Sequence, residues 1–175
     1  MKINNALLEA SKLLKINKIK SSLLDSEILL SQVLNKGREY IILNPEKNLN
    51  KKNYNEFINL VKSRSLGKPI SYIINKKDFW KNEFFILDGV LIPRPETETI
   101  IEETLRIIKN KSKLKVLDVG VGSGCILLSL LKEKKNFYGV GVDISQKCID
   151  ISHINTKILG LENRVKLFKS DIDNF

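Results

Sequence analysis

Three closely spaced glycines suggest a ligand-binding turn. Residues 117–124 read Leu-Asp-Val-Gly-Val-Gly-Ser-Gly, with a strand-like apolar run before the glycines and an apolar helical pattern after them. Glycine lets a backbone turn sharply and approach a ligand without a Cβ clash, and the following helix start directs N–H groups at a polar ligand. The sequence therefore predicts a binding turn formed by Gly120, Val121, Gly122, Ser123 and Gly124.

The glycine spacing discriminates between nucleotide ligands. A dinucleotide-binding turn has the pattern G-x-G-x-x-G, whereas this turn is G-x-G-x-G, with Asp118 two residues before the first glycine. Asp143 ends a second apolar run and is placed to accept hydrogen bonds from both hydroxyls of a ribose. This combination favours S-adenosylmethionine, a nucleoside with an amino-acid tail. The alternative is a tight turn in an unrelated α/β protein, in which Asp143 only caps the next helix.

A third acid follows a predicted strand at residues 164–169. Asp171 and Ile172 come directly after this strand. Because ligands of open α/β sheets bind at the carboxyl ends of the strands, we expect Asp171 at the same edge as Gly120 and Asp143. Asp171 could accept a hydrogen bond from the adenine amino group while Ile172 covers the ring. The alternative is an ordinary turn aspartate.

A proline-rich segment, Ile-Pro-Arg-Pro-Glu-Thr-Glu-Thr, occupies residues 92–99. Pro93 and Pro95 restrict the backbone on both sides of Arg94 and hold it extended. Pro95 and Glu96 both suit the first turn of a helix, which we expect over residues 96–109. These residues predict a rigid loop followed by a well-capped helix.

The elements around these motifs form three regions. The first is a helical bundle with apolar residues at helical spacing, in which Asn50 caps the last long helix; its helices are expected at 3–16, 22–36, 38–43 and 51–65. Residues 70–92 then contain β-type runs with the turn signal Asp88-Gly89, which predicts a β-hairpin. The third is an α/β region.

Composition excludes several classes of protein. No apolar run reaches the length of a membrane span, and the N-terminus lacks the apolar segment of a signal peptide, so we expect a cytoplasmic protein. Cys125 and Cys148 show no C-x-x-C spacing and His153 is the only histidine, so we expect free thiols and no metal site.

Positive charge is concentrated in the N-terminal region. Residues 1–75 hold 13 Lys and Arg against 6 Asp and Glu, a surplus of +7 out of the chain's +10. Such a surplus indicates contact with nucleic acid or with an acidic or RNA-associated protein. It could equally reflect a composition rich in Lys, Ile and Asn.

Four stretches together resemble the PrmC/HemK family of bacterial peptide chain release factor glutamine methyltransferases. They are residues 68–73, Phe79-Trp80 with Phe84, residues 91–98 and residues 117–124. The Ile-Pro-Arg-Pro-Glu-Thr-Glu run is the most characteristic of them, and the resemblance covers the whole chain. It implies an α/β, Rossmann-like S-adenosylmethionine-dependent methyltransferase domain, incomplete at the C-terminus, preceded by a small all-α helical bundle and a β-hairpin linker.

The resemblance also divides the chain into three segments. Residues 1–68 would form a helical substrate-recognition domain and residues 69–93 the hairpin linker. Residues 94–175 would form the N-terminal part of the methyltransferase domain. The implied partners are class 1 release factors, with no membrane, no stable nucleic-acid partner and a monomeric protein.

The implied reaction transfers a methyl group to the side-chain amide nitrogen of the glutamine in the Gly-Gly-Gln loop of those release factors. The cofactor residues would be Gly120, Val121, Gly122, Ser123, Gly124, Asp143, Asp171 and Ile172. The substrate-proximal loop would be Pro93, Arg94, Pro95, Glu96 and Thr97. Family members bind the amide with an Asn-Pro-Pro-Tyr motif beyond the position of Phe175, so we expect no catalytic residue and no metal in this chain, and activity of residues 1–175 alone is not expected.

Two alternative functions remain open. The basic bundle could belong to a non-catalytic module that binds a release factor or RNA. The chain could also belong to a methyltransferase of DNA or RNA bases, some of which share the Asn-Pro-Pro-Tyr chemistry, although the run at residues 92–98 argues against this.

Overall fold

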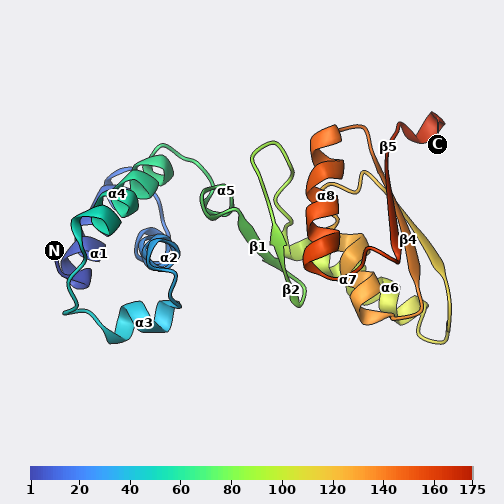
Figure 1. Cartoon of the computed structure of the whole chain (residues 1–175), viewed down its shortest axis with the longest axis horizontal. Helices are drawn as coiled ribbons and strands as arrows, with labels where there is room; N and C mark the ends of the chain where they lie inside the picture. Colours follow the sequence, from blue (N-terminus) through green and yellow to red (C-terminus); the bar gives the residue numbers. More distant parts are fainter. Residues whose placement is uncertain (175) are drawn as a thin grey trace. The chain divides into compact units, whose positions relative to one another are not determined.

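The computed structural model describes residues 1–174. The chain forms two compact units, a helical unit, Met1–Ile74, and an α/β unit that begins at Asn75 (Figure 1). Within residues 1–174, no helix combines the length and apolar character needed to cross a bilayer, and no cluster of three or more potential metal-binding His, Cys, Asp or Glu side chains is present.

The helical unit confirms the four predicted helices. Its helices are α1 (Ile3–Ile16), α2 (Ser22–Leu34), α3 (Arg38–Leu43), α4 (Lys51–Ser65) and α5 (Ile70–Ile74). Asn50 caps α4, because its side chain accepts a hydrogen bond from the Asn53 N–H at 2.7 Å. The β-type reading of residues 70–74 is wrong, since this run forms the short helix α5 and packs its isoleucines against the core of the unit.

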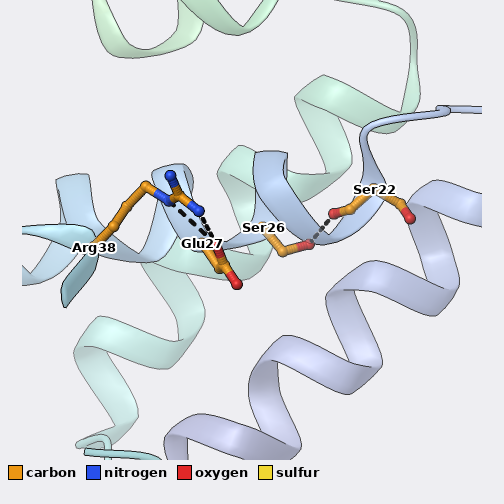
Figure 2. A network of polar contacts seen from close by, with 4 residues as sticks. All are labelled: Ser22, Ser26, Glu27 and Arg38. Carbon is orange, nitrogen blue, oxygen red and sulfur yellow. Dashed lines mark hydrogen bonds and ion pairs between the residues drawn. The ribbon is translucent and has the colours of Figure 1, made fainter. Parts of the chain in front are cut away.

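Buried charges inside the helical unit are paired. Asp25 and Glu27 of α2 are both buried. The Asp25 carboxylate accepts a hydrogen bond from Arg64 Nε at 2.7 Å, and Glu27 accepts one from Arg38 at 2.6 Å (Figure 2). A buried carboxylate is costly unless it is paired, so these arginines fix α4 and α3 against α2.

A β-hairpin opens the α/β unit. Strands β1 (Lys76–Phe79) and β2 (Asn82–Phe85) pair antiparallel. The turn between them lies at Trp80-Lys81, so the expected hairpin turn at Asp88-Gly89 is wrong. Trp80 adopts a left-handed φ of +54°, and its N–H donates to Glu98 Oε1 at 2.7 Å. This contact, distant in sequence, stabilises a turn that local preference does not favour; Asp88-Gly89 forms a separate turn after β2.

The remaining strands form a parallel sheet in the order β3-β4-β5. Its strands are β3 (Lys115–Val119), β4 (Tyr138–Asp143) and β5 (Val165–Lys169). The connecting helices are α7 (Cys125–Glu133) and α8 (Gln146–Ile158), with α6 (Glu98–Ile107) before the sheet (Figure 1). A Cβ on Gly139 of β4 would lie 2.8 Å from Leu127 Cδ1, so α7 packs closely on that face. The predicted fold class, a Rossmann-like α/β arrangement preceded by helices and a hairpin, is confirmed.

Candidate cofactor-binding site

The glycine turn follows β3 directly and uses conformations that favour glycine. Gly120, Gly122 and Gly124 have φ values of +76°, +57° and +82°, where an L side chain is strained. A Cβ on Gly120 would meet nothing within 4 Å, whereas a Cβ on Gly124 would lie 2.9 Å from Leu128 Cδ1. The start of the turn is therefore open to a ligand, and its end packs against α7.

Backbone hydrogen bonds tie this turn to the neighbouring strand. The N–H groups of Gly120 and Val121 both donate to the Val142 carbonyl, at 2.8 and 3.0 Å. The Val121 side chain is buried. The turn and the end of β4 consequently share one edge of the sheet, as predicted.

Asp143 ends β4 and lies within hydrogen-bond distance of the turn. Its Oδ2 accepts from the Gly122 N–H at 2.9 Å, and its Oδ1 accepts from the Ser145 N–H at 2.9 Å. The cap of α8 is supplied by Ser145, whose Oγ accepts from the Cys148 N–H at 3.4 Å. A carboxylate oxygen has more than one acceptor site, so Asp143 can hold the turn and still accept a hydrogen bond from a ligand hydroxyl, although the Cys148 side chain also lies within its hydrogen-bond reach.

Asp118 is a second acid under the turn, and sequence reasoning assigned it no contact. Its side chain is half-buried in β3. Burial is the largest influence and raises the pKa of Asp118 to about 6. A hydrogen bond from the Leu127 backbone opposes this rise in pKa, and the charge of Asp143 adds to it. Its position two residues before the first glycine was the available signal. Two neighbouring carboxyl groups make the site favourable for a positively charged ligand.

The end of β5 reaches the same edge. The Ser170 N–H donates to the Asp143 carbonyl at 3.1 Å, which places Asp171 directly after this contact. Asp171 and Ile172 are exposed, and Ile172 begins the short helix η2 (Ile172–Asn174). The predicted convergence of three strand ends is therefore present, with the two predicted adenine-side residues accessible to solvent.

The proline-rich loop has the predicted extended backbone at Arg94. Pro93 is buried, and the exposed Arg94 is extended, with φ −93° and ψ 144°. Residues Pro95–Thr97 form the 3₁₀ helix η1, in which the Thr97 N–H donates to the Arg94 carbonyl at 3.0 Å. Glu96 is exposed. The α-helix thus begins at Glu98, because η1 occupies the first residues expected to be α-helical.

Two side chains of α8 hold the glycine turn and were missed by sequence reasoning. Ser152 Oγ donates to the Gly122 carbonyl at 2.9 Å, and Asn155 Nδ2 donates to the Ser123 carbonyl at 2.8 Å. Both side chains are fully buried. Two polar residues three positions apart on the inner face of a helix were the only local signal.

Comparison with known proteins gives two family matches. A family described as "PrmC N-terminal domain" matches residues 5–74. A family described as "Methionine biosynthesis protein MetW" matches residues 94–173. A solved S-adenosylmethionine-dependent methyltransferase from Geobacter sulfurreducens, in complex with S-adenosyl-L-homocysteine, is 29% identical to this chain, with a TM-score of 0.38. The match covers 45% of this chain and 30% of the Geobacter chain, which is too little to bear on the site.

Curated relatives match almost the whole chain. Release factor glutamine methyltransferase from Buchnera aphidicola subsp. Baizongia pistaciae is 44% identical over 93% of this chain and 58% of its own length. The enzyme of the same name from Clostridium acetobutylicum is 39% identical over 98% of this chain and 60% of its own length. The chain therefore spans about 60% of the length of these relatives. Its sequence is therefore similar to the release factor glutamine methyltransferases over the N-terminal part of those proteins, and residues 5–74 of its helical unit match the PrmC N-terminal domain family.

Proposed function

We propose that the α/β unit binds S-adenosylmethionine at the glycine turn. The observation that carries this proposal is the contact between the turn and Asp143, in which Gly122 N–H meets Oδ2 at 2.9 Å beside an open backbone. Asp143 would accept the ribose hydroxyls, while Asp171 and Ile172 would contact adenine. The negative charge of the site would favour the sulfonium and ammonium groups of the cofactor.

We further propose that the chain belongs to a methyltransferase whose substrate is the glutamine of the Gly-Gly-Gln loop in class 1 release factors. The names of the relatives support this substrate. When bound, the cofactor supplies an electrophilic methyl group. The part of this chain's residues is to hold and orient: the turn and Asp143 fix the nucleoside, and the loop Pro93–Thr97 flanks the substrate.

Orientation matters because a side-chain amide is a poor nucleophile. Its nitrogen lone pair is delocalised into the carbonyl, so the amide must be aligned with the methyl group and its charge distribution stabilised. Residues 1–175 contain no Asn-Pro-Pro-Tyr motif. We therefore assign cofactor binding, and not amide activation, to the residues of this chain.

The helical unit is proposed to recognise the release factor. It has its own core, which includes Leu14, Leu29, Phe57 and Val61. The whole charge surplus of residues 1–75, +7, lies on this unit and supports attraction to an acidic partner.

Binding of S-adenosylhomocysteine, measured by isothermal titration calorimetry, tests the cofactor assignment. Gly122→Asp should abolish binding, because it places a strained, negatively charged side chain in the turn. Gly160→Asp is the matched control: Gly160 also has a left-handed φ, +66°, and open space around its Cβ position, but follows α8 away from the site. Equal affinities of the two variants, or no binding by the unmodified chain, would refute the assignment.

The substrate assignment needs a separate test. In cells that express the complete protein, Gly122→Asp should leave the release factor glutamine unmethylated, as read by mass spectrometry of the Gly-Gly-Gln peptide. Unchanged methylation would contradict the proposed reaction.

A further inference from the structure

We propose that Asn155 is a positioning residue that fixes the glycine turn to the β-hairpin, and through the hairpin to the loop that carries Arg94. The inference rests on the proposed cofactor role of the turn. Asn155 would touch neither cofactor nor substrate. Its buried amide on α8 would keep the glycine turn and the Arg94 loop in fixed positions relative to each other.

The contacts of Asn155 use both ends of its amide. Oδ1 accepts from the Phe85 N–H at 2.7 Å. Nδ2 donates to the Phe85 carbonyl at 3.0 Å and to the Ser123 carbonyl at 2.8 Å. The side chain is fully buried, so water cannot replace these bonds without a rearrangement of the packing. A single side chain thus joins the hairpin to the turn.

The geometry of the hairpin explains why an amide is needed. Phe85 pairs with Lys76 in the antiparallel ladder, and its N–H and carbonyl point to the outer edge of β2, toward Asn155. An exposed strand edge leaves such groups without partners. The carboxamide of Asn155 offers one acceptor and one donor, as a neighbouring strand would, and the second N–H of the amide remains for Ser123.

Apolar packing holds the same junction in place. Val90, Cys148 and Ile151 form a buried cluster, against which Phe85 and Leu87 pack. The segment that leaves β2 therefore lies on α8 close to Asn155. Rigid surroundings of this kind keep the amide in one orientation.

The other end of the hairpin is attached to the helix that follows the Arg94 loop, and to α7. The Trp80 N–H donates to Glu98 Oε1 at 2.7 Å, and the Trp80 indole Nε1 donates to Glu133 Oε1 at 2.8 Å. Glu98 is the first residue of α6 and follows η1 without a break. Because Arg94 directly precedes η1, fixing Glu98 limits the positions open to Arg94.

These contacts form one path through the α/β unit. It runs from the Arg94 loop through Glu98 and Trp80 into the hairpin, and from Phe85 through Asn155 into Ser123 of the turn. Loss of the Asn155 amide breaks the path at the turn. The turn should then sample positions unsuited to the nucleoside, although every residue that would contact the cofactor is still present.

Asn155→Ser, with Thr156→Val as the matched control, tests the proposal. Thr156 is also buried on α8, but its Oγ1 donates to the Ser152 carbonyl within the same helix, at 2.8 Å. Circular dichroism and urea titration first establish that each variant is folded. The affinity for S-adenosylhomocysteine and the hydrogen exchange of the Phe85 and Gly124 amides are then measured in the folded proteins.

The expected result for Asn155→Ser is an affinity lowered by about tenfold or more, with faster exchange at both amides. Gly124 is informative because its N–H bonds within the turn, to the Val121 carbonyl at 2.8 Å, and not to Asn155. Thr156→Val should match the unmodified chain in affinity and exchange. A purely stabilising role for Asn155 would lower the unfolding free energy and leave the affinity of the folded protein unchanged.

The outcomes separate this inference from the proposed function. Equal affinity and equal Gly124 exchange in the two variants would overturn the inference. If the unmodified chain binds no S-adenosylhomocysteine, the cofactor assignment fails, and the Gly124 exchange alone decides whether Asn155 positions the turn.

Discussion

Replacing Asp118 by Asn should stabilise the α/β unit at neutral pH while weakening cofactor binding. Burial raises the pKa of Asp118 from 3.8 to about 6, so the folded protein favours the protonated carboxyl. A carboxyl group whose folded-state pKa is raised contributes its full stability below pH about 4, and that stability is lost as the pH rises through about 6. At pH 7 the ionised Asp118 is therefore a cost that Asn avoids.

The size of this effect follows from the pKa difference. A difference of about two pKa units corresponds to about 3 kcal/mol of unfolding free energy. Because the side chain is only half-buried, solvent screening lowers this to about 1–2 kcal/mol. Asn retains an oxygen that can accept the Leu127 backbone hydrogen bond, so the geometry of β3 should be preserved. The difference between variant and unmodified chain should be near zero at pH 4 and should grow toward pH 7.

Urea unfolding followed by tryptophan fluorescence measures this difference. Trp80 is the only tryptophan of the chain, and it lies in the α/β unit, so its emission reports on that unit and not on the helical one. A stability difference that stays constant between pH 4 and 7, or a variant that is less stable at pH 7, would refute the reasoning. Calorimetry at pH 7 should show the accompanying loss of S-adenosylhomocysteine affinity.

Two further predictions concern a buried ion pair and a buried thiol. Arg64→Ala leaves the Asp25 carboxylate buried without its partner and should destabilise the helical unit by about 3–5 kcal/mol. The control Lys2→Ala, at an exposed ion pair, should cost less than about 1 kcal/mol. Equal losses of unfolding free energy for the two variants, measured by urea titration and circular dichroism, would contradict this. Burial raises the pKa of the Cys125 thiol to about 11. In a Cys148→Ser variant, the reaction of Cys125 with a disulfide reagent at pH 8 should therefore be at least about a hundredfold slower in the folded protein than in the unfolded chain. Similar rates in native and unfolded protein would show that the thiol is accessible and ionised.

The glycine turn and its acid could be predicted because the information is local. Strand, glycines, helix and second strand follow one another along the chain, and the parallel pairing of β3 with β4 brings Asp143 to Gly122. The helical spacing of apolar residues in residues 1–65 likewise predicted the helices, since each helix buries one face.

The hairpin turn and the role of Asn155 depend on contacts that the local sequence does not reveal. Asp88-Gly89 is a stronger turn signal than Trp80-Lys81, yet Trp80 is held by Glu98 and Glu133. The partners of Asn155 lie 32 and 70 residues away in sequence. In both places a side chain from another element forms the hydrogen bond to the backbone. Glu98 accepts from the Trp80 N–H, and Asn155 bonds Phe85 and Ser123.

The ion pairs of the helical unit also determine which kind of cation its surface presents. Both arginines of residues 1–74 are bound to buried acids, while all 11 lysines in this range are exposed. Lysine is a strongly hydrated point charge without the planar fork that grips a carboxylate at two points. The attraction of this unit for the proposed acidic partner should therefore come mainly from hydrated lysine charges, speed the approach of that partner and weaken steeply with salt.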